Sequence, residues 1–122
     1  MPTVNNSIDI REEFHKQARL EFVRYPVKRL KEIIFFIDPS LEWNTEIKNK
    51  IYTFRPKDME NGDISSNVPH FIKYSEIYKN LDEFIESLKI FVPSDKIEVV
   101  NGFLNVYLSK QVLLENLENI VR

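Results

Sequence analysis

The fold is decided by the stretch Asn101-Gly102-Phe103-Leu104-Asn105-Val106-Tyr107-Leu108. It holds one of only two glycines in 122 residues, where average usage of about 7% predicts roughly eight. A glycine kept in such a chain usually serves a position with positive φ or a close approach. An Asn-Gly pair is also a signal for a tight hairpin turn, and the strand-like run 97–100 precedes it. We therefore predict a hairpin of strands 97–100 and 103–108.

The second strand of this hairpin alternates between two kinds of side chain. Aliphatic residues point to one face, which we assign to the core, and an aromatic, an amide and a phenol point to the other. That second face could contact a partner, but the spacing alone favours a half-buried antiparallel strand with a polar outer side. The two sets are Leu104, Val106 and Leu108 against Phe103, Asn105 and Tyr107.

Local signals predict the other elements. Proline at a first helical turn, a capping asparagine and four-residue apolar spacing indicate helices, and alternation indicates a strand. Trp43 is expected to cover the core. The order predicts an α+β fold with helices packed on one face of a small antiparallel sheet. The segments are helices over 9–24, 26–37, 69–78, from Asn80 past Leu88, and after Ser109; a strand within 47–55; and a polar loop over 57–66.

Composition limits the class of protein. A chain of 122 residues forms one domain. It has no cysteine, so no disulfide framework or thiolate chemistry is expected. The longest apolar run, 33–37, is too short to span a bilayer, and the first residues do not resemble a secretory signal. A soluble, cytoplasmic protein without a membrane partner is expected.

Basic residues gather in one segment although the net charge is −2. Between positions 16 and 31 six bases accompany one acid, whereas from position 82 onward seven acids accompany four bases. Such a lopsided field can orient a polyanion, and it is also typical of a solvated helix face. As candidate phosphate contacts we name Lys16, Arg19, Arg24, Lys28, Arg29 and Lys31.

The residue arrangements of known catalytic and metal sites are not found in this sequence. His15 and His70 lie far apart without ligand-spaced partners, so no metal site is expected. Two glycines cannot build a phosphate-cradling loop, and no serine lies in a glycine-flanked elbow. The carboxylates lie on predicted helices among lysines and arginines, where solvation explains them. We expect neither an enzyme nor a cofactor.

Two motifs carry a resemblance to a known family. Asn61-Gly62-Asp63-Ile64-Ser65-Ser66-Asn67-Val68-Pro69 resembles the Gly-Asp-aliphatic-small-small-Asn-Val segment in the N-terminal domain of arginyl-tRNA synthetases. About forty residues on, the stretch 102–109 is similar to the second signature of that domain, Gly-aromatic-aliphatic-Asn followed by an aromatic strand and a capped helix. The resemblance covers roughly 26–122, which implies an N-terminal-like domain there and an extension with an additional helix over 1–25.

The resemblance implies a function as well as a fold. In that family the domain is a non-catalytic, tRNA-binding accessory module of translation, and the aromatic and Asn of the second signature contact a D-loop base. It therefore implies tRNA as the partner, bound by Phe103 and Asn105, with Tyr107 continuing the row and Gly102 allowing close approach. Asp63 and Asn67 are expected to fix the loop and helix start.

A further partner could be a synthetase catalytic domain. The alternative is a free-standing protein-interaction or assembly subunit that keeps the fold without binding tRNA, since fold does not establish function.

Overall fold

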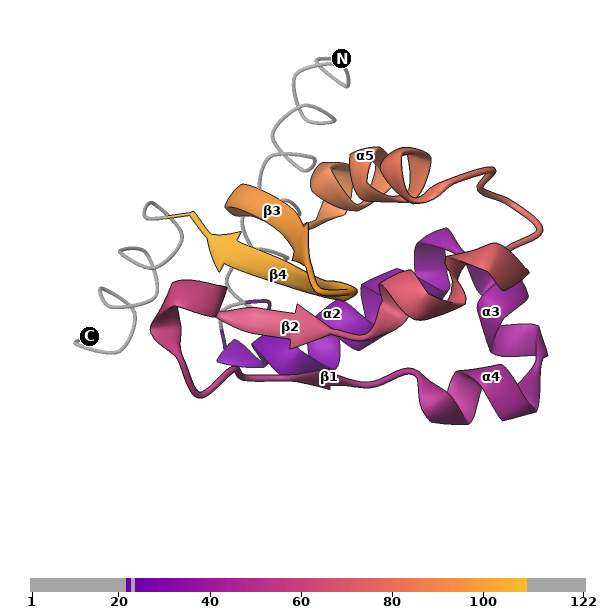
Figure 1. Cartoon of the computed structure of the whole chain (residues 1–122), viewed down its shortest axis with the longest axis horizontal. Helices are drawn as coiled ribbons and strands as arrows, with labels where there is room; N and C mark the ends of the chain where they lie inside the picture. Colours follow the sequence, from indigo (N-terminus) through magenta and orange to yellow (C-terminus); the bar gives the residue numbers. More distant parts are fainter. Residues whose placement is uncertain (1–21, 23, 110–122) are drawn as a thin grey trace, which may run out of the picture.

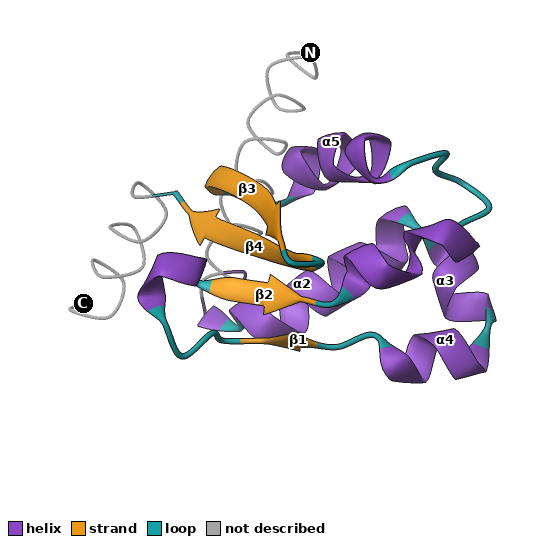
Figure 2. Ribbon diagram, in the orientation of Figure 1, coloured by secondary structure: helices purple, strands orange, loops and turns teal. Residues whose placement is uncertain are grey.

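The computed structural model describes Phe22 and residues 24–109, whose strands form one antiparallel sheet in the order β1-β2-β4-β3 (Figures 1 and 2). Helices and short 3₁₀ segments connect and cover the strands. This arrangement confirms the predicted α+β class. The elements are α2 (Pro26–Ile37), α3 (Pro39–Trp43), α4 (Thr45–Lys50), β1 (Thr53–Phe54), η1 (Met59–Asn61), β2 (Ile64–Ser66), η2 (Val68–Tyr74), α5 (Leu81–Phe91), β3 (Ser94–Val100) and β4 (Phe103–Leu108).

The predicted hairpin is confirmed as the pair β3 and β4. Asn101 and Gly102 both have positive φ, 53° and 80°, which is what a two-residue type I′ turn requires. Val100 pairs with Phe103 beside this turn, and β4 pairs on its other edge with β2, where Ser65 lies opposite Asn105. β4 is therefore a central strand.

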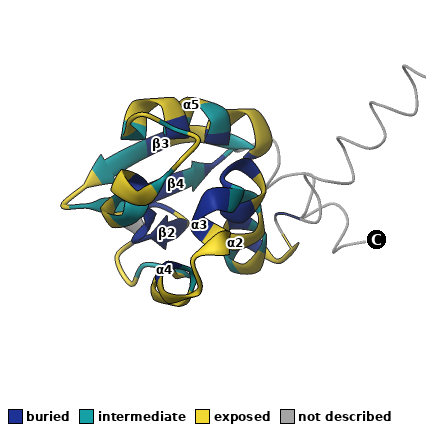
Figure 3. Ribbon diagram, turned by 90° about the vertical axis from the view of Figure 1, so that its right-hand side faces the viewer, coloured by how far each residue is buried: buried dark blue, intermediate teal, exposed yellow. Residues whose placement is uncertain are grey.

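The core lies between the sheet and the helices, as the buried residues in Figure 3 show. Helix α2 packs against β1 and β2, and α5 packs against β3. The aliphatic side of β4 faces this core, as its alternation predicted, because Leu104 and Val106 are fully buried. They lie in one apolar cluster whose fully buried members also include Leu30, Ile34, Leu41, Ile64, Phe84 and Leu88.

Two helix starts follow the sequence signals. Helix α2 begins at Pro26, where the ring's fixed φ suits the first turn and the missing N–H costs nothing. Helix α5 is capped by Asn80, whose Oδ1 accepts from the Glu83 N–H at 3.0 Å. The Glu83 carboxylate in turn accepts from the Lys79 N–H at 3.0 Å. The predicted reciprocal cap is thus present, except that Glu83 accepts from the N–H of Lys79 and not from that of the capping residue Asn80.

Several predictions in the middle of the chain were wrong. The expected strand over 47–55 starts as α4, and only Thr53–Phe54 is a strand. Asn44 explains this, since its Oδ1 accepts from the N–H groups of Glu46 and Ile47 and so begins a helix. Trp43 does not cover the core: its side chain is 70% exposed.

The segments on either side of Asn67 also differ from expectation. The end of the polar loop is β2, whose three residues are all buried because β1 and β4 pair with its two edges. The predicted helix 69–78 is a shorter 3₁₀-helix, η2. The helices predicted over 9–24 and after Ser109 lie outside the described residues, apart from Phe22 and Arg24.

A buried carboxylate ties two distant segments together. Asp38, between α2 and α3, is fully buried. The hydroxyl of Ser40 donates to one of its oxygens, and that of Ser75, at the end of η2, donates to the other at 2.6 Å. Each hydroxyl also accepts backbone hydrogen bonds: Ser40 from the N–H of Glu76, and Ser75 from the N–H groups of Ile77 and Tyr78. This network therefore fixes the approach to α5.

Candidate nucleic-acid interface

A small pocket lies on the side of the sheet that faces away from the core. Its volume is about 240 Å³, below the roughly 300–1,000 Å³ of pockets that enclose drug-sized ligands, so it suits a single flat group. Strands β1, β2 and β4 bring distant residues to it because Phe54 pairs with Ser65 and Ser65 pairs with Asn105. It is lined by Phe54, Pro56, Asn61, Ser65, Val100, Asn101, Phe103 and Asn105.

Phe103 is the half-buried aromatic wall of this pocket. Its ring meets the ring of Phe54 at 5.9 Å with an interplanar angle of 88°, and that of His70 at 5.9 Å with an angle of 87°. Edge-to-face contacts of this kind hold an aromatic ring in place. Phe103 is therefore a pre-positioned surface on which a planar base can stack.

Asn105 supplies a polar group beside that ring. Only 3% of the residue is exposed, and the Ser65 hydroxyl donates to its Oδ1 at 2.7 Å. The other end of the amide, Nδ2, has no hydrogen-bond partner among the described residues, and Asn105 lines the pocket. With Oδ1 held by Ser65, the amide offers the pocket a donor. Such a donor can bond to a group with an acceptor, such as a carbonyl oxygen.

Tyr107 shares this face of β4 but does not line the pocket. Its hydroxyl is within hydrogen-bond distance of the Glu60 carbonyl and of Glu98 Oε1, the latter at 2.9 Å, and Lys96 Nζ lies 4.5 Å from its ring centre. Burial raises the pKa of the Tyr107 phenol, and its hydrogen bond to the Glu98 carboxylate raises it further. These contacts make it a support for the loop before β2.

Gly102 also has a structural partner. A Cβ added there would lie 2.4 Å from Cε1 of His70, so the His70 ring occupies the space that the missing side chain leaves. The close approach that the glycine permits is therefore made by His70, which also contacts Phe103. Of the four predicted tRNA-binding residues, the structure brings Phe103 and Asn105 into the pocket.

The two residues expected to fix the loop hold strands instead of capping a helix. Asp63 Oδ2 accepts from the Leu108 N–H at 2.8 Å. Asn67 accepts from the Tyr52 N–H and donates to the Lys50 carbonyl, both at 2.9 Å, and makes no side-chain cap on η2. The first motif thus positions β1 and β4, which carry the pocket.

Among the predicted phosphate contacts, Arg24, Lys28 and Lys31 line a hollow beside α2. Arg29 does not line it and pairs with Glu32 at 2.8 Å. Lys16 and Arg19 lie outside the described residues.

A comparison with known proteins finds a relative of this chain. The chain is 36% identical over 73 residues to an arginine–tRNA ligase from Dichelobacter nodosus, a match that covers 55% of this chain and 12% of that protein. The match supports a relationship to the arginine–tRNA ligases. The chain thus matches about an eighth of its relative's length. No family model matches the chain, and no solved structure does.

Some pocket residues could not be named from the sequence. Phe54, Asn61 and Asn101 were seen only as parts of a strand, a loop and a turn. Alternation predicts that the side chains of Phe54 and Thr53 lie on different faces of their strand, but it does not predict which strand pairs beside them. Ser65 stood within the first motif, yet its bond to Asn105 spans forty residues.

Residues 22 and 24–109 contain neither a cluster of metal-binding side chains nor a helix that could span a membrane. This part contains no group of three or more His, Cys, Asp or Glu side chains placed to hold a metal ion. Its helices are too short or too polar to cross a bilayer.

Proposed function

We propose that this chain is a non-catalytic, tRNA-binding module that contacts the D-loop at the outer corner of tRNA. The observation that carries the proposal is the pocket in which the Phe103 ring stands beside the Asn105 amide donor. An unpaired loop base can stack on such a ring and present a carbonyl to the amide. The relationship to the arginine–tRNA ligases supports tRNA as the RNA. A cytoplasmic role beside a synthetase catalytic domain follows from the same proposal.

The test is binding of purified protein to total tRNA, followed by fluorescence anisotropy at two salt concentrations. Phe103→Ala removes the stacking surface, which is worth about 1–3 kcal/mol per base. We therefore expect a Kd roughly 5- to 140-fold higher. Phe91→Ala is the matched control, because Phe91 is an exposed phenylalanine on α5 that does not line the pocket. Equal affinities of Phe103→Ala and Phe91→Ala would remove the proposed site.

A second candidate function is protein interaction, favoured by exposed apolar side chains on α2 and α5. Phe36 and Phe91 meet edge to face at 5.5 Å, and both are exposed, as is Ile90. Exposed apolar groups that cluster mark interaction surfaces more often than isolated ones do. Sedimentation velocity tests this directly: association that Phe36→Ser abolishes, in a protein without affinity for tRNA, would favour an assembly subunit.

A further inference from the structure

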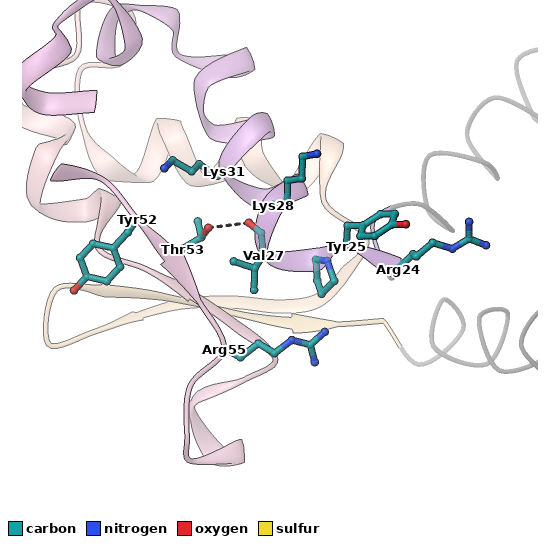
Figure 4. A pocket seen from close by; sticks show the side chains of 9 residues that line it. Arg24, Tyr25, Val27, Lys28, Lys31, Tyr52, Thr53 and Arg55 are labelled. Atoms are coloured by element: carbon teal, nitrogen blue, oxygen red, sulfur yellow. Dashed lines mark hydrogen bonds between the residues drawn. The ribbon is translucent and has the colours of Figure 1, made fainter. Parts of the chain in front are cut away.

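A second hollow lies between the first turns of α2 and the strand β1 (Figure 4). Its volume is about 480 Å³, twice that of the pocket on the sheet. Within this hollow, the hydroxyl of Thr53 donates to the Val27 carbonyl at 2.8 Å, and this bond joins β1 to α2. We call this hollow the basic groove. It is lined by Arg24, Tyr25, Pro26, Val27, Lys28, Lys31, Tyr52, Thr53 and Arg55.

Positively charged side chains gather in the basic groove. Among the described residues, its lining contains four cationic side chains and no carboxylate. Within the described part of the chain, none of the four makes an ion pair or a side-chain hydrogen bond, whereas lysines elsewhere, such as Lys50 and Lys89, pair with glutamates. Figure 4 shows Lys28 and Lys31 on one side of the Thr53 bond and Arg55 on the other. Cations from two separate segments thus line one hollow, which favours an anionic ligand.

Two tyrosines make the ligand more specific than a simple anion. Tyr25 and Tyr52 are 54% and 48% exposed, and neither hydroxyl has a hydrogen-bond partner among the described residues. Phenol groups beside arginine and lysine can contact sugars and phosphates together. The ligand chemistry that fits is therefore a ribose–phosphate chain.

Aromatic contacts connect the groove to the pocket on the sheet. The Tyr52 ring lies 5.5 Å from that of Phe54, and Phe54 lies 5.9 Å from Phe103. Tyr52 lines the groove, and the other two line the pocket. An RNA strand with one base against Phe103 could thus continue over Tyr52 toward the cations.

We propose that the basic groove binds the phosphodiester backbone next to the loop base held at Phe103. This inference rests on the proposed function and extends it with Arg55, Tyr25 and Tyr52, which the charge pattern of the sequence did not identify. It also leaves out Arg29, whose guanidinium pairs with Glu32.

The test combines a neutralised groove with salt dependence. The triple variant Lys28→Gln/Lys31→Gln/Arg55→Gln removes three candidate phosphate contacts from exposed positions. Each contact to a single strand contributes about 0.7 to the slope of log Kobs against log salt. We expect the slope for total tRNA to become shallower by about 2. Lys79→Gln, an exposed lysine outside the groove, is the matched control and should leave the slope unchanged.

The outcomes separate this inference from the proposed function. If the wild type binds tRNA and Phe103→Ala weakens it, but the triple variant keeps the wild-type slope, the groove proposal is overturned and the base pocket stands. A folded wild type that does not bind tRNA in low salt overturns both proposals.

Competition distinguishes the two possible sources of the bound phosphate, which are the RNA backbone and a small phosphate compound. Inorganic phosphate and AMP at millimolar concentration should displace little tRNA if the groove needs a continuous backbone. Displacement by either compound that the triple variant abolishes would instead identify a small-phosphate site and overturn the assignment to RNA backbone.

Discussion

The sharpest prediction concerns which end of the Asn105 amide faces the ligand. Because the Ser65 hydroxyl donates to Oδ1 at 2.7 Å, Nδ2 is left to donate to a base. Asn105→Asp keeps the size and the acceptor for Ser65 but replaces this donor with a second acceptor. A base carbonyl would then face an oxygen without a hydrogen.

The expected cost follows from the loss of one donor to the bound base. Leaving a buried polar group without its partner costs about 1–3 kcal/mol, which is roughly a 5- to 140-fold rise in the Kd for tRNA. The new carboxylate also repels RNA phosphates, and this part must be subtracted. The variant Asn101→Asp measures this repulsion separately, since Asn101 lines the same pocket and Asp-Gly also suits its type I′ turn.

The assay is anisotropy with total tRNA, and thermal melting of each variant checks that the protein is folded. We expect Asn105→Asp to bind several-fold more weakly than Asn101→Asp at the same salt concentration. Equal losses for the two variants would show that charge alone acts, and the assignment of Nδ2 as a ligand donor would be refuted. Ser65→Ala should lie between wild type and Asn105→Asp, because it frees the amide to rotate without removing the donor.

Three further predictions concern stability. Gly62→Ala should destabilise the fold more than Gly102→Ala, measured by urea denaturation, because its Cβ would meet the Val106 carbonyl oxygen at 2.7 Å, a backbone atom that cannot turn aside; equal costs would contradict this. Asp38→Ala leaves two serine hydroxyls without their acceptor and should lower the free energy of unfolding by about 1–3 kcal/mol, and an unchanged midpoint would refute the role of this network. Folding raises the pKa of Tyr107, so the contribution of its neutral phenol to stability is complete below the unfolded pKa of about 10 and is lost as pH rises through the folded pKa. The difference in free energy of unfolding between wild type and Tyr107→Phe should therefore shrink above pH 10. A difference that stays constant with pH would contradict this.

The features that local sequence predicted correctly all depend on residues within a few positions of each other. The Asn101-Gly102 turn, the start of α2 at Pro26 and the cap of α5 at Asn80 are of this kind. Alternation along β4 likewise separated its core side from its outer side. Where a local signal was overlooked, as with Asn44, the prediction of a strand failed.

The features that were predicted wrongly, or not predicted, depend on contacts between residues far apart in the sequence. Strand β2 is too short to be recognised by alternation, and it exists because β1 and β4 pair with both of its edges. The motif containing Ser65 indicated a family, but it could not show that this hydroxyl orients an amide forty residues away.

The hairpin, the helix starts and the residue types of a stacking face could thus be predicted from the sequence, because turn geometry, capping and alternation are short-range. Tertiary packing was needed to place Phe54 beside Phe103, Asn105 beside Ser65 in one pocket, and Arg55 with the cations of α2. The physical reason is that these neighbours are set by strand order and by the packing of α2 on the sheet. Both are chosen by burial of the whole core rather than by any local preference.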